Sequence, residues 1–405
     1  MAKTSKNKLY NINFEKNLPN TPTCRRSSMG WVNWGARNNY PTQLLALLAQ
    51  SPTLSACCNF AVKSLVGGGV DYEAMGVDGI QLRPNYLYSY DELIRRCAID
   101  YFTLGNFALQ IIKNRDNATY SIYHQPIETV RCAERDADGV ITAYYICRDW
   151  SAYNKYKPVQ IPSLITRDDG SWILKSGQPY LLVPEHYNPT SDYYPQPIWG
   201  SAIKAVQAEV EHVNFDLKSA SNSFVPAGAL SLPAASSDEA KQAILKNVQE
   251  MLVGSSNASQ LLVSFRDTND EEPVRFTPFT ASETNTNLFE ESSNRAISRI
   301  LSTFSIPSRT LIGYPAENTG FASEGALLEA AYTLYETLSG NDSRRAVVGV
   351  INDCLRNNGI DIEIQLRPIS FGLGLPITNG VVSSGDISEE NVEEQAFRSV
   401  GLLHD

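Results

Sequence analysis

The sequence predicts an α+β fold, with helices first, a run of short strands next and long helices in the second half. Residues 106–186 hold five segments that are rich in Ile, Val, Tyr and Thr and alternate apolar with polar side chains. Residues 195–224 and 284–306 instead repeat apolar residues at steps of three and four, which is the helical period. Because the strands are short and separated by turn residues, we expect an antiparallel meander rather than a doubly wound parallel sheet.

The composition sets bounds on the class of protein. A chain of 405 residues is long enough for two or three domains, and its formal net charge is −10. The sequence lacks both a long apolar run and the apolar centre of a secretory signal, so we expect neither a membrane span nor secretion. The protein is then expected in the cytoplasm or in an assembly. The acidity argues against a tight DNA binder, because affinity for phosphates comes from Lys and Arg. It fits either a passage that repels sliding DNA or a simple gain in solubility.

Motifs for known chemistry are missing from the sequence. The seven cysteines contain no CxxC pair, the four histidines are scattered, and there is no phosphate-binding loop, GxSxG or HExxH. We therefore expect no catalytic, cofactor-binding or metal site and no cofactor. The adjacent Cys57 and Cys58 lie in an apolar helical run and are expected in a core. Glu291 is expected to pair with Arg295 one turn further along a helix.

The first half begins with a polar, lysine-bearing segment, residues 1–30, and continues with helices. A helical stretch over 42–66 is interrupted at Ser51-Pro52, because proline favours the first turn of a new helix. A second helix is expected over 89–104, with Ser89 or Asp91 at its start and Gly105 at its end.

The second half is expected to hold two long helices around an insertion. The first helix carries a heptad stripe, with Glu209 among the charged residues assigned to its other face. Such a stripe predicts packing against another helix, although an ordinary surface helix over a core would also carry one. Residues 225–283 contain a helical segment at 237–253 and two strand-like segments. After the second long helix, which must end at Pro307, a turn-rich loop leads to further helices and a strand at 361–371.

Two groups of residues resemble the portal (head–tail connector) proteins of tailed bacteriophages. The first group runs along the second long helix into the loop and comprises Glu290, Arg299, Ile300, Phe304, Pro307, Leu311 and Gly313. The second lies near the N-terminus and comprises Trp34-Gly35, Asn38-Asn39-Tyr40-Pro41, Ser51-Pro52 and Gly67-Gly68-Gly69. The order of the elements resembles that family over roughly residues 25 to 370.

The resemblance implies a division of the chain into eight parts. They are an arm (1–30), a wing domain (31–198), a first stem helix (199–224), a small α/β clip (225–283), a second stem helix (284–306), a channel loop (307–325), returning wing helices and a strand (326–371), and a reduced crown or tail (372–405). Subunit contacts are expected along the stem at Val206, Val210, Val213, Leu217, Ile297, Ile300 and Phe304. The residues expected to face DNA are Tyr314, Asn318, Thr319 and Phe321.

The function implied by the resemblance is structural. About twelve copies would form a ring at one capsid vertex, through which double-stranded DNA is packaged and ejected. The implied partners are the terminase large subunit, a head–tail adaptor and the major capsid or scaffold protein, in the virion and, during assembly, in the host cytoplasm. Two alternatives stay open: another head–tail component, or a soluble α+β enzyme whose site is unrecognised. A ring needs Val206, Val213 and Leu217 at subunit contacts, whereas a monomer would bury them.

Overall fold

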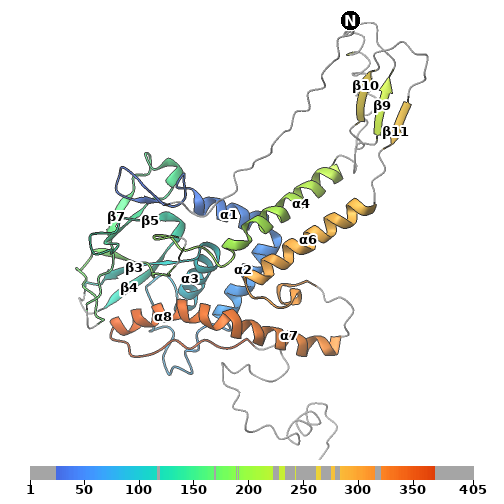
Figure 1. Cartoon of the computed structure of the whole chain (residues 1–405). Helices are drawn as coiled ribbons and strands as arrows, with labels where there is room; N and C mark the ends of the chain where they lie inside the picture. The colour runs from blue at the N-terminus through green and yellow to red at the C-terminus, as the bar shows by residue number, and fades with distance from the viewer. Residues whose placement is uncertain are drawn as a thin grey trace, which may run out of the picture.

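A computed structural model describes residues 24–115, 119–167, 170–187, 189, 191–221, 228–232, 242, 261–265, 275–278, 283–314 and 321–369. Helices and mostly antiparallel sheets form one mixed body, from which two long helices extend to a separate small sheet (Figure 1). The predicted α+β class is confirmed. The predicted insertion helix at 237–253 and the tail at 372–405 lie outside the described residues, and so does most of the arm.

Four helices contribute buried faces to the core of the body. They are α1 (Tyr40–Gln50), α2 (Pro52–Val66), α3 (Tyr90–Leu104) and α8 (Asn341–Asn357). The predicted break at Ser51 separates α1 from α2, whose axes differ by 100°. The hydroxyl of Ser89 accepts a hydrogen bond from the Glu92 amide at 3.5 Å, and Gly105 ends α3 with a φ of +86°. Both helix boundaries therefore follow from capping residues, as predicted.

Two three-stranded sheets cover one side of these helices. In the first, β3 (Ala108–Lys113) lies between β4 (Tyr120–Gln125) and β8 (Pro179–Leu182). The second contains β5 (Val130–Cys132), β6 (Ala143–Ile146) and β7 (Val159–Pro162). The prediction of one continuous meander is wrong, because β8 returns to β3. That pairing sets Leu182 opposite Leu109 and Tyr180 opposite Ile111, whereas alternation along the sequence specifies only which face of a strand is buried.

The segment before α1 is locked onto the second sheet by a buried arginine. The segment contains a short pair of strands, β1 (Arg25–Arg26) and β2 (Val32–Asn33). The turns η1 (Ile127–Thr129) and η2 (Trp150–Ala152) flank the second sheet. The guanidinium of Arg131 lies 5.6 Å from the ring of Trp34 and 4.8 Å from that of Trp150. Burial lowers the pKa of Arg131 to about 10, which leaves it charged at neutral pH.

The three glycines after α2 form hydrogen bonds and close contacts with the last described segment of the chain, at Arg367. The Gly68 amide donates to the Arg367 carbonyl at 2.8 Å, and the Arg367 amide donates to Gly69 at 2.8 Å. A Cβ on Gly67 would lie 2.3 Å from that same Arg367 oxygen, so the close approach requires glycine. The predicted strand at 361–371 is wrong over its described part, which makes a single bridge from Leu366 to Val70. Its facing partner is a tight glycine turn, which is too short for a ladder.

The two long helices run side by side away from the body (Figure 1). A turn, η3 (Gly200–Ala202), leads into α4 (Ile203–Ser221), which packs on α6 (Glu283–Thr303). At their far end β9 (Gly228–Leu232) pairs parallel with β10 (Leu261–Phe265) and antiparallel with β11 (Arg275–Pro278). The sequence predicted the last two strands and missed β9.

The chain returns from α6 to the body through a turn and a last long helix. The turn is η4 (Arg309–Ile312), and the helix α7 (Phe321–Tyr335) continues through the π-helical turn η5 (Glu336–Gly340) into α8. Among the described residues no single helix is long and apolar enough to cross a membrane, although α1 and α2 together pass that test as a sharply bent pair.

Candidate functional site: helix α2 and the flanks of the loop

Helix α2 is the element on which the long helices and the loop segment converge. It contacts α6, η4, η5 and α8, and polar side chains from α4, α7 and α8 reach its two ends. These contacts bring together residues that are more than 150 positions apart in the sequence. The two ends of α2 therefore join polar side chains from several distant segments of the chain.

A carboxylate from α4 caps the start of α2. Glu209 is only 6% exposed, accepts a hydrogen bond from the Ser51 hydroxyl, and accepts another from the Thr53 amide at 3.2 Å. The amides of the first turn lack partners inside a helix, and the positive end of the helix dipole favours an anion there. Glu209 supplies both an acceptor and a negative charge, so it attaches α4 firmly to α2.

An arginine from α8 caps the other end of α2. Arg344 donates to the Ser64 carbonyl at 2.9 Å and to the Leu65 carbonyl at 3.4 Å, both in the last turn of α2. Its guanidinium also pairs with Glu336 of η5 at 2.8 Å, and Glu336 accepts from the Ser64 hydroxyl. A cation at the C-terminal end complements the dipole in the same way as Glu209 does at the other end.

Two tyrosines attach the segments on either side of residues 315–320 to the same helix. The hydroxyl of Tyr314, the last described residue before this segment, lies 3.3 Å from the Thr53 hydroxyl at the start of α2. On the far side, the hydroxyl of Tyr332 in α7 lies 3.2 Å from the Ser64 hydroxyl near the end of α2. Burial raises the pKa of Tyr332 to about 12, so this phenol stays protonated. Both flanks of the predicted channel loop are thus fixed to α2.

The site offers rigidity rather than reactivity. Cys57 in α2 is fully buried, and burial, with a smaller contribution from the Glu209 carboxylate, raises the pKa of its thiol to about 12. A protonated, enclosed thiol is a poor nucleophile. The expected core position of Cys57 and Cys58 is confirmed. Across the described part of the chain, no group of three His, Cys, Asp or Glu residues could hold a metal ion.

The predicted stem contacts divide into two groups. The side chains of Val206, Val210, Ile297, Ile300 and Phe304 are buried inside the chain. Val213 is 47% exposed and Leu217 is 67% exposed, further along α4. The five buried residues pack inside the protomer, so Val213 and Leu217 are the most exposed of the seven predicted contacts.

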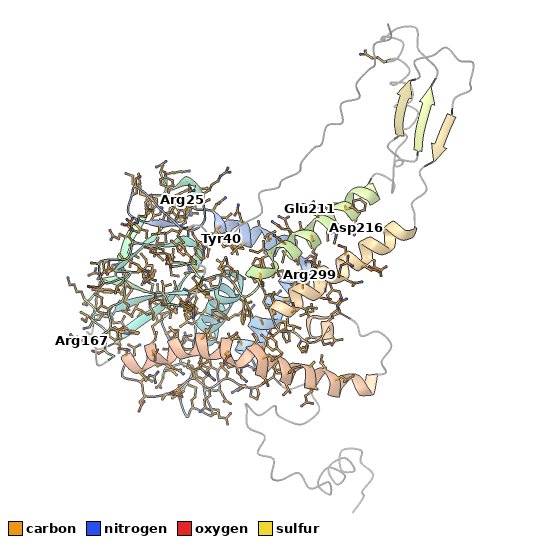
Figure 2. All side chains as sticks on the ribbon, viewed as in Figure 1. Arg25, Tyr40, Arg167, Glu211, Asp216 and Arg299 are labelled. Carbon is orange, nitrogen blue, oxygen red and sulfur yellow. The ribbon has the colours of Figure 1, made fainter. Side chains whose placement is uncertain are left out.

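Charged residues follow the exposed part of the long helices. Figure 2 places Glu211 and Asp216 on α4 and Arg299 on α6. The predicted pair of Glu291 and Arg295 is confirmed, with 3.3 Å between their charged atoms.

The predicted DNA-facing residues are placed only in part. Tyr314 is half-buried against the core, with its hydroxyl near Thr53, so it acts as an anchor of the loop. Asn318 and Thr319 lie outside the described residues, and Phe321 opens α7 with a side chain that is not among those described. On the side before the loop, Arg309 of η4 donates to Ser298 of α6 at 2.9 Å, which fixes η4 to the long helix.

Sequence reasoning missed the buried polar residues of this site. The sequence pattern places Glu209 on the face opposite the heptad stripe, and it does not single out Glu336 or Arg344. The sequence held a weak sign that Glu209 is buried, because the apolar residues Ala205 and Val206 precede it by one helical turn. Both are buried in the structure. When alanine is counted as apolar, the apolar face of the helix is wider than the narrow seam of a heptad repeat.

The fold is shared with chains of a virus-like particle. Neither a protein-family model nor a curated protein matches this chain. A chain from the neck of the empty gene transfer agent (GTA) particle, computed with C6 symmetry, is 16% identical with a TM-score of 0.52, covering 90% of this chain and 91% of that chain. Chains from the native GTA virion and from the native GTA neck computed with C12 symmetry are each 14% identical with a TM-score of 0.50, at the same coverage. The resemblance to a head–tail structural protein that the sequence predicted is therefore confirmed for the fold.

Proposed function

We propose that this chain is a portal protein, which forms a ring of about twelve copies at one capsid vertex and conducts double-stranded DNA during packaging and ejection. The observation that carries the proposal is the long pair α4 and α6, which leaves the body and ends in a small sheet, as a stem ends in a clip (Figure 1). The similar fold of chains from GTA neck and virion particles supports it.

The parts of the chain then take the roles that the resemblance implied. Residues 31–198 form the wing, α4 and α6 the stem, and the sheet of β9, β10 and β11 belongs to the clip. The clip would contact the terminase large subunit during packaging and the head–tail adaptor afterwards. The wing would face the major capsid or scaffold protein. The protein would reside at the portal vertex of the virion and in the host cytoplasm during assembly, and it would not be an enzyme.

The loop between Tyr314 and Phe321 would line the channel, with Asn318, Thr319 and Phe321 nearest to DNA. The anchors at Thr53 and Ser64 support this role, because a loop beside moving DNA needs fixed ends. The net charge of −10 also fits, since an acidic passage does not retain phosphates.

The experiment that tests the ring uses electron microscopy and solution mass of the full chain, with and without capsid protein. We expect the wild-type chain to form rings with a central hole. Val213→Asp should abolish them, because it places a charge at a subunit contact, while the circular dichroism of the chain stays unchanged. Ile80→Asp, a charge at an exposed site outside the stem, is the matched control and should leave rings intact.

Either of two results would contradict the proposal at a different level. If Val213→Asp forms normal rings, the stem contact is wrongly assigned. If the wild-type chain forms no ring even with capsid protein present, the portal function is wrong. The next candidate is another component of the head–tail junction, which the place of similar chains in the neck of a particle favours. Such a protein would bind the vertex without conducting DNA. A chain that forms no ring and binds no particle would point to the enzyme alternative and to a substrate screen.

A further inference from the structure

A cavity of about 700 Å³ opens beside the second sheet, and no residue of α2, α4 or α6 is in its lining. It is lined by the hairpin between Cys132 and Tyr144 and by the segment 183–195, and we call it the hairpin cavity. Ile141, Tyr144 and Tyr193 give it apolar and aromatic walls. Val140, in the same lining, is 54% exposed, so apolar surface is left uncovered there.

The polar groups of the hairpin cavity are firmly held, with one exception. Arg135 donates to Glu185 and to the Asp192 carbonyl, both at 2.8 Å, and so ties the hairpin to the facing segment. His186 also lines the cavity, and its Nε2 is buried without a hydrogen-bond partner among the described residues. A buried nitrogen of this kind is destabilising unless a further group bonds to it.

The described part of the chain begins at the edge of this cavity. Cys24, the first described residue, lies with its sulfur 3.4 Å from the hydroxyl of Ser191, which lines the cavity. The preceding residues 1–23 include a segment, residues 8–16, in which Tyr10, Ile12 and Phe14 alternate with asparagines. Alternation of this kind places three apolar side chains on one face of an extended chain.

We propose that the hairpin cavity binds residues 8–16 of the same chain, with the apolar face of Tyr10, Ile12 and Phe14 against its aromatic wall. Nine residues separate Phe14 from Cys24 and include Pro19, Asn20 and Pro22, which favour a reversal of the chain. Even a partly folded linker of this length reaches back to the cavity, since an extended chain spans about 3.3 Å per residue.

Charge favours the same occupant. The segment 8–16 has a lysine at each end, Lys8 and Lys16, against the single Glu15, and Lys3 and Lys6 precede it. The cavity lining contributes the acidic residues Glu185 and Asp192 against the single Arg135. A backbone N–H or C=O of the bound segment can also pair with the ring nitrogen of His186. This intrachain docking is independent of the proposed portal function.

Hydrogen exchange of the full-length chain tests the proposal. We expect the amides of residues 8–16 to exchange at least about tenfold more slowly than those of an unstructured peptide, at a rate independent of protein concentration. Val140→Lys should abolish this protection, because it removes apolar surface and repels the lysines. Val159→Lys is the matched control, at a 61% exposed position on β7 that does not line the cavity. Unchanged exchange of α3 would show that each variant is folded.

Three outcomes would overturn the proposal. Residues 8–16 exchange as fast as an unstructured peptide in the wild-type chain, or they stay protected in Val140→Lys. In the third, their protection rises with protein concentration, which would assign the cavity to a second copy. A converse variant, with Tyr10, Ile12 and Phe14 changed to Ser, should speed exchange in residues 183–187. None of these readouts requires rings, so a failure of the portal proposal, seen by microscopy, would remain distinct.

Discussion

At the scale of the residue, Glu209 shows how one buried carboxylate joins two helices that are far apart in sequence. It occupies the place where the unpaired amides at the start of α2 require an acceptor. Its second oxygen accepts a hydrogen bond from the Ser51 hydroxyl. That hydroxyl in turn accepts a hydrogen bond from the Leu54 amide at 3.1 Å. The Thr53 hydroxyl also lies 3.3 Å from that of Tyr314, so the same turn of α2 holds both Glu209 and one flank of the loop.

Removing this carboxylate should therefore destabilise the fold. We expect Glu209→Ala to lower the free energy of unfolding of the unassembled chain by about 2–4 kcal/mol, since the Ser51 hydroxyl and the Thr53 amide lose their acceptor. Glu209→Gln keeps one acceptor oxygen and should lose less. Asp216→Ala, on the exposed part of the same helix, should stay within about 0.5 kcal/mol of the wild type. Urea unfolding followed by circular dichroism measures all three, and equal stability of the two alanine variants would refute the capping role.

The sequence predicted half of this arrangement. Ser51-Pro52 was identified as a helix boundary, because serine and proline have strong local preferences there. Glu209 was not identified, because a glutamate on a helix is usually solvated and only its partner in space shows otherwise. The same holds for Arg344, whose acceptors on α2 are 279 and 280 positions away in the sequence.

At the scale of the element, the π-helical turn η5 between α7 and α8 accommodates a buried ion pair. The extra residue of a π-turn changes the direction of the side chains that follow it, and such turns are frequent at functional sites. Here Glu336 faces Ser64 and Arg344, and Gly340 lies against the Glu336 side chain. A Cβ at Gly340 would lie 2.8 Å from the Glu336 carboxylate, whose position both partners fix.

Two helical glycines should consequently respond to the same substitution with opposite signs. A Cβ at Gly349 in α8 would meet no neighbouring element within 4 Å, so Gly349→Ala should stabilise the chain by about 0.5–1 kcal/mol through helix propensity. Gly340→Ala gains the same propensity but displaces Glu336, and a net loss of about 1–3 kcal/mol is expected. Thermal unfolding of both variants checks this, and a stabilised Gly340→Ala would show that Glu336 is free to move.

Elements with strong local signals were predicted and those that depend on pairing were not. The helices α1, α2 and α3 follow from apolar periodicity, and capping serines mark the starts of α2 and α3. The partner of β8 and the existence of β9 depend on contacts between distant segments. The alternation of apolar and polar residues along one strand does not predict such contacts. The stripe on α4 was correctly assigned to helix packing, but its first half packs against α6 of the same chain.

At the scale of the whole molecule, the acidity of the chain and the anchored loop both determine how the proposed ring would interact with DNA. A ring that conducts DNA has to enclose the duplex without retaining it. Attraction to phosphates rises with each Lys or Arg that contacts them and falls steeply with salt. In the proposed ring, a net charge of −10 on every chain would keep the field of the channel repulsive to phosphates.

Adding positive charge to the loop should therefore slow DNA. We expect rings carrying Asn318→Lys and Thr319→Lys to package DNA about threefold to tenfold more slowly at low salt, because each copy adds two phosphate contacts. The defect should diminish as salt rises, since screening weakens those contacts. Thr337→Lys, at an exposed position of η5, is the control for charge alone and should package normally. The measurement is the packaging rate of assembled particles at two salt concentrations. If the loop variant packages at the wild-type rate in low salt, the loop lies away from DNA. If its defect does not change with salt, the substitutions have damaged the ring rather than added contacts to phosphates.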